Sequence, residues 1–177
     1  MQAYPADSIT VVLYTQAQFE DLTQFPAWAS AAYDGRIRVP ALGAELSLDR
    51  LETVLSHEFT HAVVSGLGGR AVPMWLNEGL ATVFEPRGVE ASAEFLARSG
   101  QRIELSSLQH GFSELPPELV RLAYAQSAQS VAQLLQMVGA SGVVALLKDV
   151  ATGADFRGAF ERRVGVPFAT FEAVVLR

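Results

Sequence analysis

The first fifty residues combine short apolar runs with polar stretches, which is typical of a small unit of strands and helix. Residues 9–14 are rich in β-branched side chains and predict a strand. Residues 35–39 alternate between charged and apolar side chains, so they predict a second, half-exposed strand. Between the strands, residues 15–25 carry an apolar side chain at every third position, which predicts a short helix that Pro26 ends.

From Asp49 the apolar positions follow the period of an α-helix. One stripe is formed by Leu51, Val54, Leu55, Phe59 and Ala62. Asp49 and Glu52 resemble a capping box at its start, and a glycine-rich stretch from Gly66 ends it. A second helix is predicted over residues 74–84, because Pro73 suits a helix start and Pro86 forbids extension.

The rest of the chain carries mostly helical patterns. We expect a less regular helix over residues 91–98, a long one over residues 117–137, and three shorter helical segments after it. Gly139, Gly153 and Gly165 are expected to divide these segments. Strands first and helices last predict the α+β class.

Length and composition fit one globular domain. With 177 residues, of which 50% are hydrophobic and 18% charged, the chain is long enough to bury a continuous core. We expect a single domain over residues 1–177, made of a small αβ unit (1–48), a set of central helices that would hold any bound metal (49–100) and a helical part (101–177). Glutamines and glycines interrupt the apolar stretch at 131–147, so we expect no membrane span. The compartment is undetermined, and an extracytoplasmic location is favoured if a leader or anchor was removed.

Charge and cysteine content narrow the chemistry. Thirteen basic against nineteen acidic residues leave a net charge of −6, which disfavours a nucleic-acid partner. The chain has no cysteine, which excludes disulfides, a thiolate nucleophile and cysteine-based zinc sites. Any bound metal must therefore use histidine and carboxylate ligands.

Residues 57–61 read His-Glu-Phe-Thr-His, an H-E-x-x-H motif inside the first predicted central helix. On a helix, positions i and i+4 differ by about 40° around the axis and by about 6 Å along it. His57 and His61 therefore project from one face and suit two ligands of one metal ion. Glu58 is rotated by about 100° from His57, which suits a general base acting on water rather than a ligand.

A catalytic zinc site usually has three protein ligands, so a third must be found. The metzincin pattern is excluded, because its glycine and histidine positions hold Val64 and Leu67. The remaining histidine, His110, lies in a predicted loop far along the chain. Glu78, on the second central helix, is the better candidate.

Here the sequence resembles a known family. H-E-x-x-H followed closely by N-E-G on a second helix is similar to the gluzincin metallopeptidases, and W-L-N-E-G-x-A at residues 75–81 resembles the aminopeptidase N-like enzymes. Tyr-Ala-Gln-Ser, starting at Tyr124, is most similar to bacterial peptidase MA-like domains, relatives of the thermolysin-like enzymes. The resemblance covers roughly residues 50–130. It implies a zincin-like fold with a small N-terminal sheet that has an edge strand.

The resemblance also implies roles for particular residues. One Zn²⁺ per chain would be bound by His57, His61 and Glu78, while Glu58 would activate water. Tyr124 would support the oxyanion that forms during peptide hydrolysis, although a core aromatic residue is the alternative at this position.

Several features depart from related patterns. Thermolysin-type enzymes have an Asp four residues after the ligand glutamate, where this chain has Thr82, so a ligand histidine needs another partner. Glu85 matches a glutamate of the aminopeptidase pattern, but a solvated surface position explains it equally well. The roles of Thr82, Glu85 and His110 therefore stay open. Trp75 and Trp28 are predicted to be core residues.

Substrate contacts are less defined. The G-x-M-E-N stretch with which aminopeptidases hold a substrate's amino terminus is absent before His57, which favours endopeptidase over exopeptidase activity. We expect the edge strand to be residues 35–39, pairing with an extended substrate. The alternative is an edge protected from pairing by Arg36 and Arg38.

The predicted function is zinc-dependent hydrolysis of peptide bonds by metal-activated water, with a peptide or protein as substrate. Three alternatives remain open. The first is a zinc-binding scaffold domain without turnover, the second a zinc hydrolase of a non-peptide bond, and the third a structural α+β domain in which His57 and His61 only pack.

Overall fold

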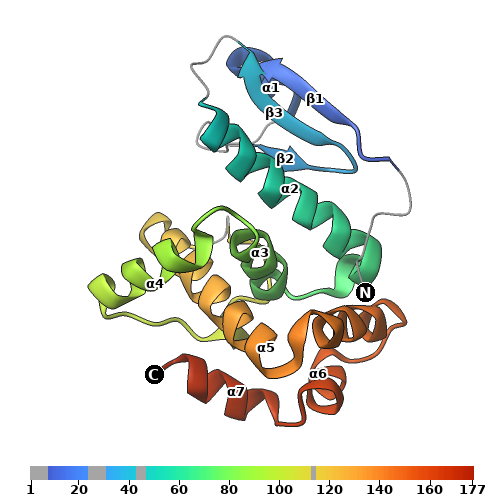
Figure 1. Cartoon of the computed structure of the whole chain (residues 1–177), viewed down its shortest axis with the longest axis vertical. Helices are drawn as coiled ribbons and strands as arrows, with labels where there is room; N and C mark the ends of the chain where they lie inside the picture. The colour runs from blue at the N-terminus through green and yellow to red at the C-terminus, as the bar shows by residue number, and fades with distance from the viewer. Residues whose placement is uncertain (1–7, 24–30, 43–46, 113–114) are drawn as a thin grey trace.

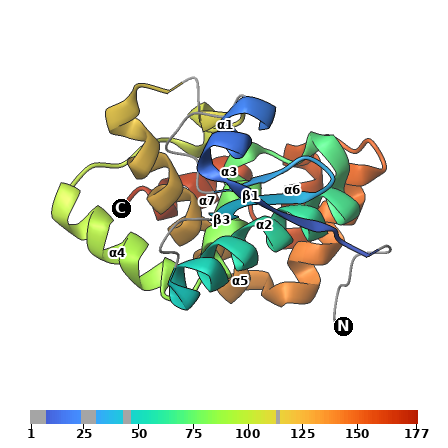
Figure 2. The ribbon, with the colours of Figure 1, turned by 90° about the horizontal axis from the view of Figure 1, so that it is seen from above.

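The computed structural model describes residues 8–23, 31–42, 47–112 and 115–177. Strands and one short helix occupy one end of the molecule, and the remaining helices occupy the other (Figure 1). Seen from above, the strands and α1 lie in front of the helices (Figure 2). This arrangement is α+β, as the sequence predicts.

The sheet has three strands in the order β1-β3-β2. Along the chain the elements are β1 (Val11–Thr15), α1 (Gln16–Thr23), β2 (Ala32–Tyr33) and β3 (Ile37–Leu42). Strand β3 pairs in parallel with β1 and antiparallel with β2. The predicted helix over residues 15–25 is confirmed as far as it is described, whereas its last two residues and Trp28 lie outside the described residues.

The prediction that residues 35–39 form the edge strand is wrong. They belong to β3, the central strand, where Ile37 and Val39 are almost fully buried. The alternation of charged and apolar side chains shows which face of the strand is buried, but not whether the strand has a neighbour on each side. Arg38 is partly exposed, and its guanidinium donates to Asp34 at 3.0 Å and to the Tyr14 hydroxyl at 2.5 Å. The edge next to the long helix α2 is instead the two-residue strand β2.

Helix α2 (Leu48–Gly68) crosses the molecule between the sheet and the other helices (Figure 1). The predicted Asp49–Glu52 capping box is wrong: Ser47 is the N-cap, and its hydroxyl accepts a hydrogen bond from the Arg50 backbone N–H. The predicted stripe is also partly wrong, because Phe59 is 45% exposed whereas Glu58 is buried. The Glu58 side chain therefore lies on the inner side of α2, and Phe59 lies on the outer side.

The other helices follow the predicted order. They are α3 (Met74–Val83), α4 (Gly88–Ser99), α5 (Pro117–Ala151), α6 (Phe156–Val164) and α7 (Phe168–Val175), with short 3-10 turns η1 (Gly69–Ala71) and η2 (Leu105–Ser107). The three predicted dividing glycines, Gly139, Gly153 and Gly165, all have positive φ. At Gly139, φ of 66° and ψ of 174° break α5 into two helical parts.

Most of the buried apolar side chains form one core around α3 and α5. Trp75 is fully buried in it, as predicted, against Phe156, Phe168 and Phe171. A second, smaller core lies between the sheet and the first half of α2 and contains Ile37, Val39 and Val54. The site described below lies where α2 leaves the small core and meets α3.

By length and composition alone, one helix of the described chain, α5, could cross a membrane. Its side chains instead form much of the main core, where Val131 and Leu134 are fully buried. Gly139 also divides it.

Candidate metal centre

Two imidazoles project from one face of α2. The ring centroids of His57 and His61 are 4.7 Å apart, with the ring planes at 83° to each other. This is the outcome that the i, i+4 spacing predicts on a regular helix. Both side chains are largely buried, with 18% and 15% of their surfaces exposed.

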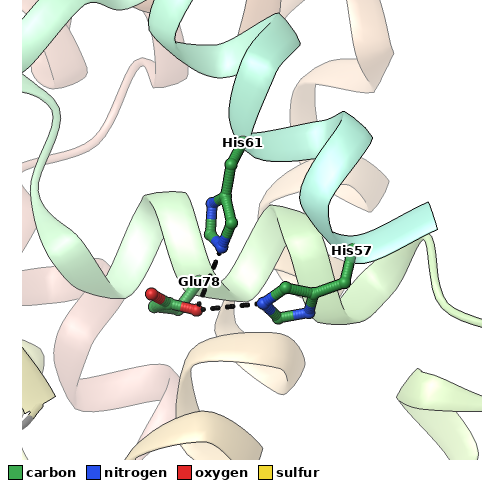
Figure 3. A group of neighbouring side chains, drawn as sticks. All are labelled: His57, His61 and Glu78. Atoms are coloured by element: carbon green, nitrogen blue, oxygen red, sulfur yellow. Dashed lines mark ion pairs between the residues drawn. The ribbon is translucent and has the colours of Figure 1, made fainter. Parts of the chain in front are cut away.

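Helix α3 brings Glu78 to the same point (Figure 3). Its Oε2 atom lies 3.4 Å from Nε2 of His57 and 3.5 Å from Nε2 of His61. The same oxygen is buried and makes no hydrogen bond within the described chain. The three predicted ligands are thus brought together, with one ligand atom from each within 4.8 Å of the others.

A close crossing of α3 and α5 fixes the position of Glu78. A Cβ atom at Gly79 would lie 2.5 Å from the backbone oxygen of Ser127 and 2.6 Å from Cγ2 of Val131. Only glycine fits this crossing, which explains physically why a glycine follows the glutamate in the N-E-G motif. The buried side chains of Leu76 and Leu80 flank Glu78 on the same helix.

The donor set fits a zinc ion. In a tetrahedral site with metal–ligand distances of about 2.0–2.1 Å, the ligand atoms lie about 3.3 Å apart. The two contacts to Glu78 Oε2, at 3.4 and 3.5 Å, match that separation. Two imidazoles and one carboxylate are also among the ligand sets of catalytic zinc.

The charges of the three side chains are strongly coupled. Burial raises the pKa of Glu78, but the two adjacent imidazoles outweigh burial and lower the pKa to about 2. Burial lowers the pKa of His57, but Glu78 and Glu85 outweigh burial and raise the pKa to about 10. The pKa of His61 is also raised, against burial, by contact with Glu78. Without a cation, the carboxylate therefore holds protonated imidazoles.

Each histidine has a second partner at its other ring nitrogen. Nδ1 of His57 lies 2.6 Å from Oε1 of Glu85, and Nδ1 of His61 lies 3.1 Å from Oδ1 of Asn77. Since both partner oxygens are acceptors, each Nδ1 carries the proton, and in the neutral ring Nε2 is left bare as a metal ligand. The sequence interpretation missed Asn77, although it directly precedes the candidate ligand Glu78.

The structure also locates Thr82, Glu85 and His110, whose roles the sequence leaves open. Glu85 is the partner of His57, so the solvated alternative is wrong for it. Thr82, at the position of the thermolysin-type Asp, is buried, and its hydroxyl has no hydrogen-bond partner in the described chain. His110 is exposed and does not line the cleft of the site.

Glu58 and Tyr124 both face the cleft beside the three converging side chains. Glu58 is only 7% exposed, and burial raises the pKa of its carboxyl. The ring centroid of Tyr124 lies 6.5 Å from that of His57, and its ring packs edge-on against Phe112. Burial and the nearby carboxylates raise the pKa of the Tyr124 hydroxyl, so it stays protonated at neutral pH.

The site opens into a cleft of about 930 Å³. One wall is the β2 edge and the turn after it, residues 31–35; the others come from α2, η1, the start of α3 and residues around Phe112 and Tyr124. Among the described strands, the edge strand that reaches the cleft is thus β2 and not residues 35–39.

An H-E-x-x-H helix that faces a glutamate from the next helix defines a gluzincin-like domain. The family model of the peptidase MA superfamily matches residues 3–174, so the chain belongs to the peptidase MA superfamily. Comparisons with curated proteins and with solved structures gave no match.

Proposed function

We propose that this domain hydrolyses peptide bonds with a zinc ion bound by His57, His61 and Glu78. The observation that carries the proposal is the convergence of three donor atoms from two helices around a buried carboxylate oxygen that makes no hydrogen bond. A protein rarely leaves such an oxygen unsatisfied without a functional reason. When bound, zinc would supply the Lewis acidity that lowers the pKa of a water ligand to about 7.

The partners of the two histidines prepare them for that role. Glu85 accepts the Nδ1 proton of His57, and Asn77 accepts that of His61. Both contacts hold Nε2 toward Glu78 and keep the rings from rotating. The pair of orienting residues comes from α3 and the turn after it, so α3 supplies one ligand and orients the other two.

Glu58 is the proposed general base. Its position one residue after His57 turns its carboxylate away from the ligand set but keeps it on the cleft. Burial raises its pKa, which makes the carboxylate a stronger base than an exposed glutamate. It accepts a proton from the attacking water and then donates that proton to the leaving amine.

Tyr124 is the proposed hydrogen-bond donor to the substrate carbonyl oxygen. Its hydroxyl stays protonated because burial and nearby carboxylates raise its pKa. A donor placed where negative charge develops stabilises the transition state more than the ground state.

Endopeptidase activity is the form of hydrolysis that the cleft favours. Among the described strands, β2 is an edge strand and lines the cleft beside the H-E-x-x-H helix, and backbone pairing with it would hold an extended peptide with little sequence selectivity. The sequence also lacks the G-x-M-E-N stretch that holds an amino terminus in aminopeptidases. Substrate would therefore extend on both sides of the cleaved bond.

Replacing the base while keeping the ligands tests this proposal. We expect Glu58→Gln to retain zinc and to lose turnover of unstructured peptides by about 10²- to 10⁴-fold. Glu52→Gln, an exposed carboxylate on the same helix, is the matched control and should keep full activity. Equal turnover by Glu58→Gln and wild type would contradict the role of Glu58. Zinc binding without any peptide hydrolysis by the wild type would favour the scaffold alternative.

A further inference from the structure

One arm of the cleft extends beyond His61 along the last turns of α2. Its walls come from α2, η1 and the start of α3 and consist of Val64, Ser65, Arg70, Val72 and Met74. All of these side chains except Arg70 are apolar or neutral. Arg70 is also the only lysine or arginine that lines the cleft in the described chain.

The backbone around Arg70 is fixed by two glycines. A Cβ atom at Gly68 would lie 2.4 Å from Cγ2 of Val72 and 3.2 Å from Cδ2 of Leu147 on α5. Gly69 ends α2 with φ of 65°, a conformation that side chains disfavour, and its N–H donates to the Ser65 oxygen. The turn is therefore held against α5, and Arg70 is presented from an anchored backbone.

Arg70 has no charged partner in the described chain, whereas two carboxylates that line the cleft, Asp34 and Glu78, have basic partners. Asp34 binds Arg38 at 3.0 Å, and Glu78 lies against both histidines. The Arg70 side chain is exposed, and it makes no hydrogen bond or ion pair with any described residue. In a chain with nineteen acidic and thirteen basic residues, an unpaired arginine facing a cleft is well suited to bind an anion from outside.

A carboxylate is the anion that fits a peptide cleft. The guanidinium group forms two parallel hydrogen bonds with a carboxylate. Helix α2 ends at Gly68, seven residues or about 10 Å along the helix axis beyond His61, and Arg70 lies in the turn that follows. An extended peptide advances about 3.3 Å per residue, so this distance corresponds to about three residues.

We propose that Arg70 is a specificity residue that binds a substrate carboxylate about three residues from the cleaved bond. That carboxylate is either the side chain of Asp or Glu or the C-terminal carboxylate of a short peptide. The inference rests on the proposed peptidase function and adds a substrate class to it, namely peptides that carry a negative charge on one side of the cleaved bond.

The test measures binding separately from turnover. Zinc-loaded Glu58→Gln protein is titrated with fluorescent peptides in matched pairs, Glu against Gln at each position and free carboxylate against C-terminal amide, and anisotropy gives each Kd. In at least one pair, we expect the peptide with the carboxylate to bind about fivefold more tightly than its neutral partner or better, since a charged hydrogen bond at a partly exposed site is worth roughly that factor. The preference should weaken as salt is raised.

Substitutions in the same background assign the preference to Arg70. Arg70→Gln should abolish it and leave the Kd of neutral peptides unchanged, whereas Arg70→Lys should keep part of it. Arg98→Gln, which removes the same charge from exposed α4 outside the cleft, should keep all of it. Unchanged zinc content and circular dichroism establish that the Arg70 variants are folded.

The outcomes separate this inference from the proposed function. Equal affinity for all pairs, no peptide binding at all, or a preference that survives Arg70→Gln would overturn the role of Arg70. If the preference persists in amidated peptides, Arg70 binds the acidic side chain. If it is restricted to peptides with a free C-terminal carboxylate, Arg70 binds the C-terminus. Loss of the preference in Arg70→Gln supports the inference even where the wild type hydrolyses no peptide, in which case only the proposed hydrolysis fails.

Discussion

The two helices that carry the candidate ligands are held in very different ways. Helix α3 lies in the main core, where Trp75, Leu76 and Leu80 are at most 4% exposed. Helix α2 rests its first half on the small core with Val54 and exposes Phe59 on its outer side. One ligand helix is therefore fixed on several sides, and the other bridges two cores.

The difference shows how the site is built. Glu78 stands on the fixed helix, and Asn77 and Glu85 reach from that helix and the turn after it to the histidines of α2. The contacts between these side chains connect the half of the molecule that contains the sheet to the helical half. We therefore expect changes in α3 to act on the whole fold, and changes at the start of α2 to act locally.

The largest effect on stability is expected when a methyl group is added at the crossing of α3 and α5. Gly79→Ala would place a Cβ atom 2.5 Å from the Ser127 backbone oxygen, which cannot move without shifting α5. Overpacking against backbone should lower the free energy of unfolding by about 3 kcal/mol, measured by urea denaturation. Zinc affinity should fall with it, because Glu78 moves.

The control for this prediction is Gly66→Ala on α2, where a new Cβ atom meets nothing within 4 Å. Because alanine is the better helix former, this variant should be as stable as the wild type or up to about 1 kcal/mol more stable. Equal urea midpoints for the two variants would show that α3 is not packed more tightly at Gly79 than α2 is at Gly66.

The second effect is a pH dependence of the metal-free protein. The pKa of His57 is raised from 6.5 to about 10, so its stabilising contribution is complete below pH 6.5 and is lost as the pH rises toward 10. Between pH 7 and 9 the free energy of unfolding should fall by about 2–3 kcal/mol. Glu78, with its pKa lowered to about 2, contributes above pH 4.5 and loses its contribution as the pH falls toward 2.

Urea denaturation in the presence of chelator at pH 6, 7 and 9 measures this dependence. The same series on Glu78→Gln should decline less steeply, because one of the two carboxylates that raise the pKa of His57 is gone. A stability that stays constant or rises from pH 7 to pH 9 would show that contact between the helices does not hold the metal-free site.

A smaller effect is expected from the orienting carboxylate. Glu85→Gln removes the charged partner 2.6 Å from Nδ1 of His57 but leaves all three ligands. Loss of such a partner typically lowers metal affinity by about 10- to 100-fold, which competition with a chromophoric chelator measures. Glu90→Gln, an exposed carboxylate on α4, is the control. Identical zinc affinity in both variants would return Glu85 to the role of a surface residue.

The smallest effect is expected at the start of α2. Ser47→Ala removes the hydroxyl that accepts the Arg50 N–H and should lower the free energy of unfolding by about 1 kcal/mol. Zinc affinity should be unchanged, because the cap lies far along the helix from His57. Ser141→Ala, at an exposed position within α5, serves as control and should cost nothing. A large drop in zinc affinity for Ser47→Ala would show that the start of α2 is coupled to the site.

What the sequence predicts well is local. The i, i+4 spacing of His57 and His61 fixes their common face once the helix forms, and Gly139, Gly153 and Gly165 end helices because of the φ values that they adopt. The juxtaposition with Glu78 was predicted only through a family resemblance. Nothing in its spacing from His61 shows that α3 turns back against α2.

What the sequence does not predict depends on tertiary contacts. The alternation in residues 35–39 predicts one buried face, but the central place of β3 depends on β1 and β2, which pair with it on either side. The inward turn of Glu58 depends on packing around α2, and the partnership of Glu85 with His57 needs the turn after α3. In each case the outcome depends on neighbours from another element.

The zinc site is tested first by measuring the zinc content and zinc affinity of the purified, tag-free chain and of its Glu78→Ala variant, by plasma mass spectrometry and chelator competition. We expect one zinc per wild-type chain and loss or marked weakening of binding in the variant. No zinc in either protein after supplementation, or equal affinity in both, would contradict a site built from two helices.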